Sequence, residues 1–158
     1  MDKNQLLIMN FNEIRRRSII VWRAIPNEYM DWKPDKKAMS CSQMIRHVLE
    51  AEFLYHKILL AGGTKNSPIF TNPFEGRKFV SVEDELKFVK PLREDFITYI
   101  SDIPESDLEN KQINREDVGY VRTLGDMLLR IGYHESVHTG QLLDYMRSMG
   151  ITRPNIWD

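Results

Sequence analysis

The amino-acid sequence predicts an all-α protein with the architecture of an up-and-down four-helix bundle. Four stretches of sixteen or more residues carry apolar side chains at helical spacing, and no stretch has the alternation of a convincing strand. The 158 residues are 42% hydrophobic and 28% charged, a composition that suits one soluble globular core. We therefore expect a single helical-bundle domain over residues 1–158.

The first two helices are delimited by a proline and by a capping box. Residues 6–25 mix apolar and charged side chains at helical spacing, and the proline that follows ends this pattern. The second helix begins at Ser40, where Gln43 completes a capping box, and it ends before two glycines at 62–63. The connection at 26–34 is rich in aromatic residues and prolines, so we expect it to pack over an end of the bundle.

The last two helices each begin at a hydroxyl residue that is followed by an aspartate three residues later. These two N-caps are Ser81 and Thr123. The third helix ends before Pro104, and the fourth ends at Gly150. The connections at 62–80 and 104–122 are predicted to be loops, and the first is long enough to pack as a lid.

Composition and charge argue against several classes of partner. The formal net charge is −1, and we interpret Arg15–Arg17 as the solvated face of a helix, so no nucleic-acid partner is expected. No signal peptide and no apolar run of membrane-spanning length is apparent, which predicts a cytoplasmic protein without a membrane partner. The single cysteine, Cys41, excludes an intramolecular disulfide and fits a reducing compartment. A helix dipole can lower the pKa of a thiol in a first turn, but the commoner role of such a cysteine is to pack.

Two of the four histidines lie one turn apart on the last predicted helix. At about 100° per residue, His134 and His138 are about 40° apart, and Met127 and Ile131 share their face. Two imidazoles within an apolar stripe are costly without polar partners, and a bound metal ion would remove that cost. The pair therefore predicts a metal site. The alternative is that one imidazole is a hydrogen-bonded core residue and the other borders solvent.

The second predicted helix carries the other two histidines. His47 and His56 are nine residues apart and lie on nearly opposite faces, so we expect only one of them to face the core. Because the residues that share its helix face are apolar, His47 is expected to face the core. His56 is expected at the surface or in an interface. His47, His134 and His138 would supply three neutral imidazoles and leave a coordination position for water or substrate, as in catalytic sites. Zinc, nickel and ferrous iron all accept such ligands.

The letters from His134 to His138 also match H-E-x-x-H, the zinc-peptidase motif in which Glu135 would be the general base. No Glu or His follows His138, and Asp144 lies away from both imidazoles on the helical wheel, so a third ligand must come from upstream. Glu135 could serve as a base for metal-activated water, although we favour an exposed position for it. Gln141 shares the face of both ligands, where its amide supports the metal site or only packs against a neighbouring helix.

Several of these features occur together in one known family. The segment Trp32-Lys33-Pro34, the helix that opens at Ser40 and carries His47, and the run His-Glu-Ser-Val-His-Thr-Gly-Gln-Leu at 134–142 resemble the DinB/YfiT-like family of four-helix-bundle metalloproteins. The resemblance covers nearly the whole chain, and H-x-x-x-H-x-G-Q-L is its most specific part. It implies a divalent-metal triad of His47, His134 and His138, and a homodimer. Characterised relatives include thiol-dependent S-transferases and a thiol-dependent isomerase that use low-molecular-weight thiols.

Three functions are compatible with these expectations. The first is a metal-dependent thiol S-transferase, in which the metal lowers the pKa of a small thiol and directs it toward a small electrophile. The second is a metal-dependent hydrolase, in which the metal activates a water molecule. The third is a non-catalytic metal-binding or interaction domain. The sequence assigns no catalytic residue beyond the candidate metal ligands.

Overall fold

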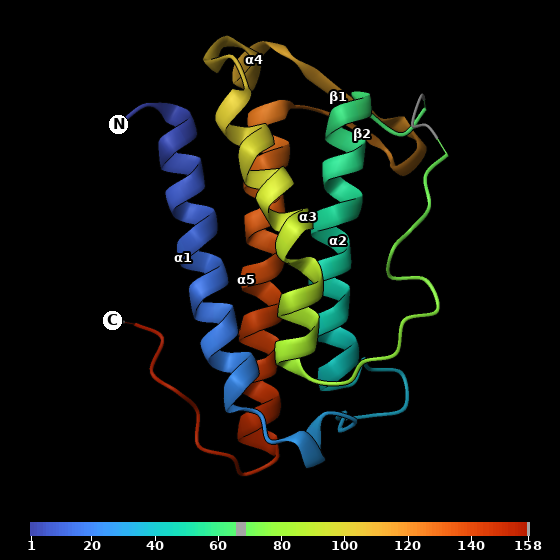
Figure 1. The fold of residues 1–158 in the computed structure, drawn as a ribbon, viewed down its shortest axis with the longest axis vertical. Helices are drawn as coiled ribbons and strands as arrows, with labels where there is room; N and C mark the ends of the chain where they lie inside the picture. Colours follow the sequence, from blue (N-terminus) through green and yellow to red (C-terminus); the bar gives the residue numbers. More distant parts are fainter. Residues whose placement is uncertain (66–68, 158) are drawn as a thin grey trace.

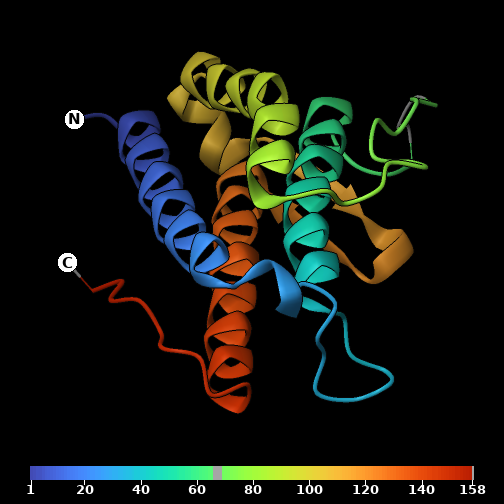
Figure 2. The same ribbon diagram turned by 60° about the horizontal axis from the view of Figure 1, so that its bottom comes forward.

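The computed structural model describes residues 1–65 and 69–157, and in these residues four long helices form a bundle (Figures 1 and 2). The long helices are α1 (Lys3–Ala24), α2 (Cys41–Ala61), α3 (Val82–Asp102) and α5 (Leu124–Ser148). Shorter elements connect them: the 3-10 turns η1 (Asn27–Tyr29) and η2 (Glu116–Val118), the helix α4 (Glu105–Asn110), and the strands β1 (Gln112–Arg115) and β2 (Tyr120–Thr123). The predicted all-α four-helix bundle is confirmed.

The long helices do not alternate in direction as the predicted up-and-down arrangement requires. In Figure 1, α1 and α5 run downward while α2 and α3 both run upward. The parallel course of α2 and α3 is also visible in their contacts, since Arg46 pairs with Glu85 and Arg93 pairs with Glu52. It arises because residues 69–81 run back along the outside of the bundle before α3 begins. Helices α2 and α3 pack against each other, and α5 packs against α1 and α2.

The predicted capping residues delimit the helices as expected. Ser40 and Gln43 form a reciprocal capping box at α2, and the hydroxyls of Ser81 and Thr123 accept hydrogen bonds at the starts of α3 and α5. The first helix begins at Lys3, earlier than predicted, because the Asp2 side chain forms a further capping box there. Polar residues at the start of α1 therefore continue the helix beyond its apolar pattern.

The segments before α2 and α3 pack against the bundle. Trp32 lies edge-to-face against Tyr145 with their ring centroids 5.3 Å apart, which confirms that residues 26–34 cover one end. In the long connection, Phe74 is buried and lies 6.2 Å from the ring of Phe53, so this loop is also packed. Residues 66–68, which belong to the same predicted loop, lie outside the described residues.

Cys41 is a packing residue. Its side chain is fully buried at the start of α2, and burial raises the pKa of the thiol to about 11. The lowered thiol pKa that a helix N-terminus can produce is not present, because desolvation outweighs the effect of the backbone donors.

The connection between α3 and α5 differs from the predicted loop. It contains α4 and an antiparallel hairpin in which Gln112 pairs with Thr123 and Arg115 pairs with Tyr120. Each strand has only four residues and a largely polar sequence, so the alternation that identifies a strand is too short to recognise. The hairpin is the one β element in the described ranges, 1–65 and 69–157.

The hairpin is fixed to the end of α2 by a close backbone contact. The amide of Asn114 donates to the Gly62 carbonyl at 3.0 Å, and the Thr64 amide donates to the Asn114 carbonyl at 3.0 Å. A Cβ atom on Gly63 would lie 2.1 Å from the Asn114 carbonyl oxygen, and Gly63 has a φ of +143°. Only glycine permits this approach, and it holds the hairpin at a fixed distance from α2.

None of the helices in the described part of the chain combines the length and the apolar character needed to cross a membrane.

Candidate metal centre

Three histidine side chains meet in the seam between α2 and α5. The Nε2 atom of His134 lies 3.0 Å from Nε2 of His47 and 3.0 Å from Nε2 of His138. One ligand atom of each residue lies within 4.8 Å of the others. Nitrogen atoms bound to one metal at 2.0–2.1 Å in tetrahedral geometry would be about 3.3 Å apart. The group therefore has the donor atoms and the compactness to hold a metal ion.

The two helices position these imidazoles from opposite sides. His134 and His138 lie one turn apart on α5 with ring centroids separated by 4.5 Å, and the His47 ring lies 4.9 Å from each. The structure thus brings together the three histidines that the sequence singled out. They are half-buried at the edge of the helix contact and not enclosed in the core. A ligand could therefore reach them from solvent.

The environment favours the neutral form of His134 and His47. Desolvation, followed by repulsion from the neighbouring imidazoles, lowers the pKa of His134 to about 4. The same causes lower the pKa of His47. Metal ions bind the unprotonated nitrogen, so this shift favours metal ligation near neutral pH.

Gln141 holds one of the three imidazoles in orientation. Nδ1 of His138 lies 2.7 Å from Oε1 of Gln141. An amide oxygen can only accept, so Nδ1 carries the proton and the Nε2 lone pair faces the other histidines. Gln141 is exposed and contacts the candidate ligand directly. This geometry favours the supporting role over packing against a neighbouring helix.

Glu135 is neither the general base nor an exposed residue. It is buried and faces α1, where Arg15 Nε donates to Oε1 at 2.8 Å and Arg15 Nη2 donates to Oε2 at 3.0 Å. Burial by itself would raise the pKa of Glu135, but the charge and hydrogen bonds of Arg15 lower it. Its carboxylate is committed to this ion pair, so the H-E-x-x-H interpretation is wrong in its general base as well as in its third ligand.

Arg15 is likewise buried, which corrects its placement on a solvated face. Besides Glu135, its Nη2 donates to Glu52 Oε2 of α2 at 3.2 Å. Arg93 of α3 also pairs with Glu52 and donates to the Phe11 carbonyl of α1 at 2.8 Å. We call Arg15, Glu52, Arg93 and Glu135 the buried ionic cluster, and its four members come from the four long helices.

His56 is buried, although the sequence predicted a surface position. Its ring packs 5.5 Å from Phe96 and 5.1 Å from Tyr99 of α3. Burial lowers the pKa of His56 to about 4, and its Nε2 atom has no hydrogen-bond partner among the described residues. The prediction was wrong because α2 packs against α5 on one side and α3 on another, so that two of its faces are covered.

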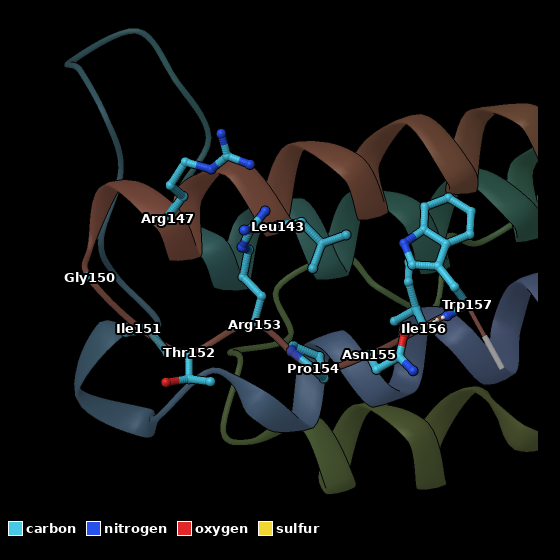
Figure 3. Close-up of a pocket in the computed structure, with 10 residues that line it drawn as sticks. All are labelled: Leu143, Arg147, Gly150, Ile151, Thr152, Arg153, Pro154, Asn155, Ile156 and Trp157. Carbon is cyan, nitrogen blue, oxygen red and sulfur yellow. Dashed lines mark hydrogen bonds between the residues drawn. The ribbon is translucent and has the colours of Figure 1, made fainter.

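A cavity of about 680 Å³ lies elsewhere, between the end of α5 and the C-terminal segment. Figure 3 shows Leu143 and Arg147 on the helix and residues 150–157 around the opening. None of the three candidate ligands lines it. This cavity is therefore distinct from the histidine site.

We predict that Arg15→Met, which removes the charge but keeps an unbranched side chain, lowers the free energy of unfolding by about 3 to 5 kcal/mol. The substitution leaves Glu52 and Glu135 with less compensation in the interior, which is the costly way to break a buried ion pair. Arg23→Met is the control, because the pair of Arg23 with Glu83 on the same helix is exposed and should matter little. Chemical denaturation would measure both, and equal losses would contradict the role of the cluster.

Comparison with known proteins agrees with the observed fold. The family model of the DinB superfamily matches residues 10–142. The uncharacterised protein YjoA of Bacillus subtilis (strain 168) is 22% identical over 153 residues, which cover 96% of this chain and 94% of YjoA. The crystal structure of this DinB-like protein has the same fold, with a TM-score of 0.71, 22% identity and 96% of each chain covered. On the family match, the chain belongs to the DinB superfamily.

Proposed function

We propose that the chain binds a divalent metal ion through Nε2 of His47, His134 and His138 and is a thiol S-transferase acting on small electrophiles. The observation that carries this proposal is the convergence of three imidazole nitrogens from two helices. Three protein ligands are the usual complement of catalytic zinc sites, which keep a position open. When bound, such an ion would supply Lewis acidity that lowers the pKa of a thiol or water at that position.

The acidic residues around the histidines favour a thiol over water as the nucleophile. Glu135 is tied to Arg15, and Glu50, whose charge acts on His47, accepts a hydrogen bond from Asn72 at 2.5 Å. Glu135 is therefore not free to serve as a general base, and one of the two oxygens of Glu50 is already hydrogen-bonded. A thiol ionises near pH 8.5, far below bulk water at about 15.7, and so needs less assistance to become nucleophilic. Hydrolysis is the alternative that this arrangement supports less.

In the proposed transfer, the thiol releases its proton to solvent and its sulfur attacks the electrophilic carbon. A carbon–sulfur bond forms, and the leaving group departs with the electron pair of the bond that breaks. His47, His134 and His138 would hold the ion, and Gln141 fixes the tautomer of His138. The histidines are only half-buried, so they remain accessible from solvent.

A homodimer is also part of the proposal. Large apolar side chains are exposed on α1, at Leu6 and Met9, and on α5, at Leu129, Tyr133 and Val137. Apolar side chains gathered on two neighbouring helices are a surface that a second copy would cover.

Three further expectations remain predictions from the sequence. These are a cytoplasmic location, the absence of a nucleic-acid partner, and a metal that is zinc, nickel or ferrous iron.

We predict that His47→Ala, His134→Ala or His138→Ala reduces the metal content of the reloaded protein to background. Each change removes one of three ligands. His56→Ala is the matched control, since it removes a buried histidine of α2 that faces α3, and its metal content should stay at the wild-type level. Elemental analysis, with circular dichroism to verify folding, would measure this. Metal loss in all four variants would contradict the assignment of His47, His134 and His138 as the metal ligands.

Gln141→Leu should weaken metal affinity or activity about 10- to 100-fold, because the change removes the acceptor that orients His138. Gln141→Glu retains an oxygen acceptor and should preserve most of the affinity. Competition with a metal-sensitive dye would provide the affinities. A Leu variant within twofold of wild type in affinity, with only its thermal stability changed, would assign Gln141 to packing.

The function is tested by an assay that combines metal and thiol dependence. We expect the metal-loaded protein to couple a small thiol to 1-chloro-2,4-dinitrobenzene, and we expect this activity to disappear after chelation and in the His134→Ala variant. Ester hydrolysis without thiol would support the hydrolase instead. Metal binding with neither activity would support a non-catalytic domain.

A further inference from the structure

Three arginines gather around one tyrosine at the turn end of the hairpin. Arg115 of β1, Arg122 of β2 and Arg130 of α5 place their guanidinium carbons 5.7, 5.4 and 4.8 Å from the ring centroid of Tyr120. We call Arg115, Arg122 and Arg130 the arginine cluster. An aromatic ring has two faces, so cation–π contact with Tyr120 alone cannot accommodate three guanidinium groups equally.

The charge of this cluster is only partly compensated. Arg122 pairs with Asp126 at 2.6 Å, whereas Arg115 and Asp117 are 4.0 Å apart. Arg130 makes no ion pair with any other described residue. The Nε atoms of all three arginines are buried and have no hydrogen-bond partner within the described part of the chain. Guanidinium groups whose charge is only partly compensated attract an anion.

The arginine cluster adjoins the candidate metal centre. Arg130 precedes His134 by four residues, which places both on one face of α5 with about 5 to 6 Å between their Cβ atoms. Tyr55 of α2 lies between the two sites: its ring centroid is 6.4 Å from that of His134 and 6.0 Å from the Arg115 guanidinium carbon. The arginine cluster and the histidines are therefore neighbouring sites that share contacts with Tyr55.

The distance between the two sites is set by rigid elements. The hairpin is fixed to α2 through the backbone bonds of Asn114, and the Leu124 amide donates to the Lys111 carbonyl at 2.8 Å where β2 meets α5. Arg130 and His134 lie on the same continuous helix. The spacing between cluster and histidines thus selects ligands by the separation of their functional groups.

We propose that the arginine cluster binds a carboxylate of a thiol substrate whose sulfur would bind the ion held by His47, His134 and His138. This inference rests on the proposed function and specifies its substrate class as anionic, carboxylate-bearing low-molecular-weight thiols. Guanidinium groups match the geometry of a carboxylate in bidentate fashion, which gives direction as well as charge. Tyr55 lines the path between the sulfur and the carboxylate.

The test compares an anionic and a neutral thiol on cobalt(II)-loaded protein. The thiolate-to-cobalt absorption band reports sulfur binding directly, without turnover. Mercaptosuccinate and 2-mercaptoethanol are titrated into wild type, Arg130→Gln and Arg115→Gln. We compare the ratio of the two affinities between proteins, because intrinsic differences between the thiols then cancel.

We expect the preference for mercaptosuccinate to fall about 10-fold in Arg130→Gln and Arg115→Gln, with 2-mercaptoethanol binding unchanged. Arg153→Gln, an exposed arginine of the C-terminal segment, is the control and should keep the wild-type ratio. Arg130 has no ion pair among the described residues, so its variant should fold even if Arg115→Gln does not.

The outcomes separate this inference from the function on which it rests. Failure of the wild type to bind cobalt, or of 2-mercaptoethanol to produce the absorption band, would overturn the proposed function. Cobalt and 2-mercaptoethanol binding with the same affinity ratio in wild type and both arginine variants would overturn the role of the arginine cluster alone.

Discussion

The placement of the histidines depends on the ion pair between Arg15 and Glu135. Arg15 also reaches Glu52, so this one guanidinium joins α1 to both α5 and α2, the helices that carry the candidate ligands. Charges buried to this extent tolerate few arrangements, because a shift of one helix would leave a carboxylate uncompensated. The cluster thus sets how α2 and α5 face each other. His47 and His134 meet at the opposite side of that contact, with their nitrogens 3.0 Å apart.

The sequence predicted the helices and the three histidines well, because both depend on local information. Capping residues such as Ser40 mark a helix end through bonds to neighbouring residues, and the separation of His134 and His138 follows from the helical repeat. His56 and Arg15 were misplaced for a shared reason. The number of covered helix faces is a tertiary property, and the charged or polar side chain suggested solvent where a partner helix was present.

The hairpin and its attachment to α2 could not be predicted from the sequence. Its four-residue strands have no recognisable alternation, and its attachment depends on a contact between Gly63 and Asn114 that are far apart in the chain. The glycine pair at 62–63 indicated only the end of a helix. Its second role, to admit a carbonyl oxygen where any side chain would clash, appears once β1 is in place. The gathering of arginines around Tyr120 follows from the same attachment.

The positions of the carboxylates and arginines near the histidines decide which nucleophile suits the site. Glu135, which follows His134 in the sequence, is held by Arg15, and one oxygen of Glu50 accepts a hydrogen bond from Asn72. Positive charge instead lies one helical turn away, at Arg130. A site whose adjacent carboxylate, Glu135, is already paired and that adjoins a cation suits a nucleophile that ionises easily and carries a negative group of its own. Water has neither property, whereas an anionic thiol has both.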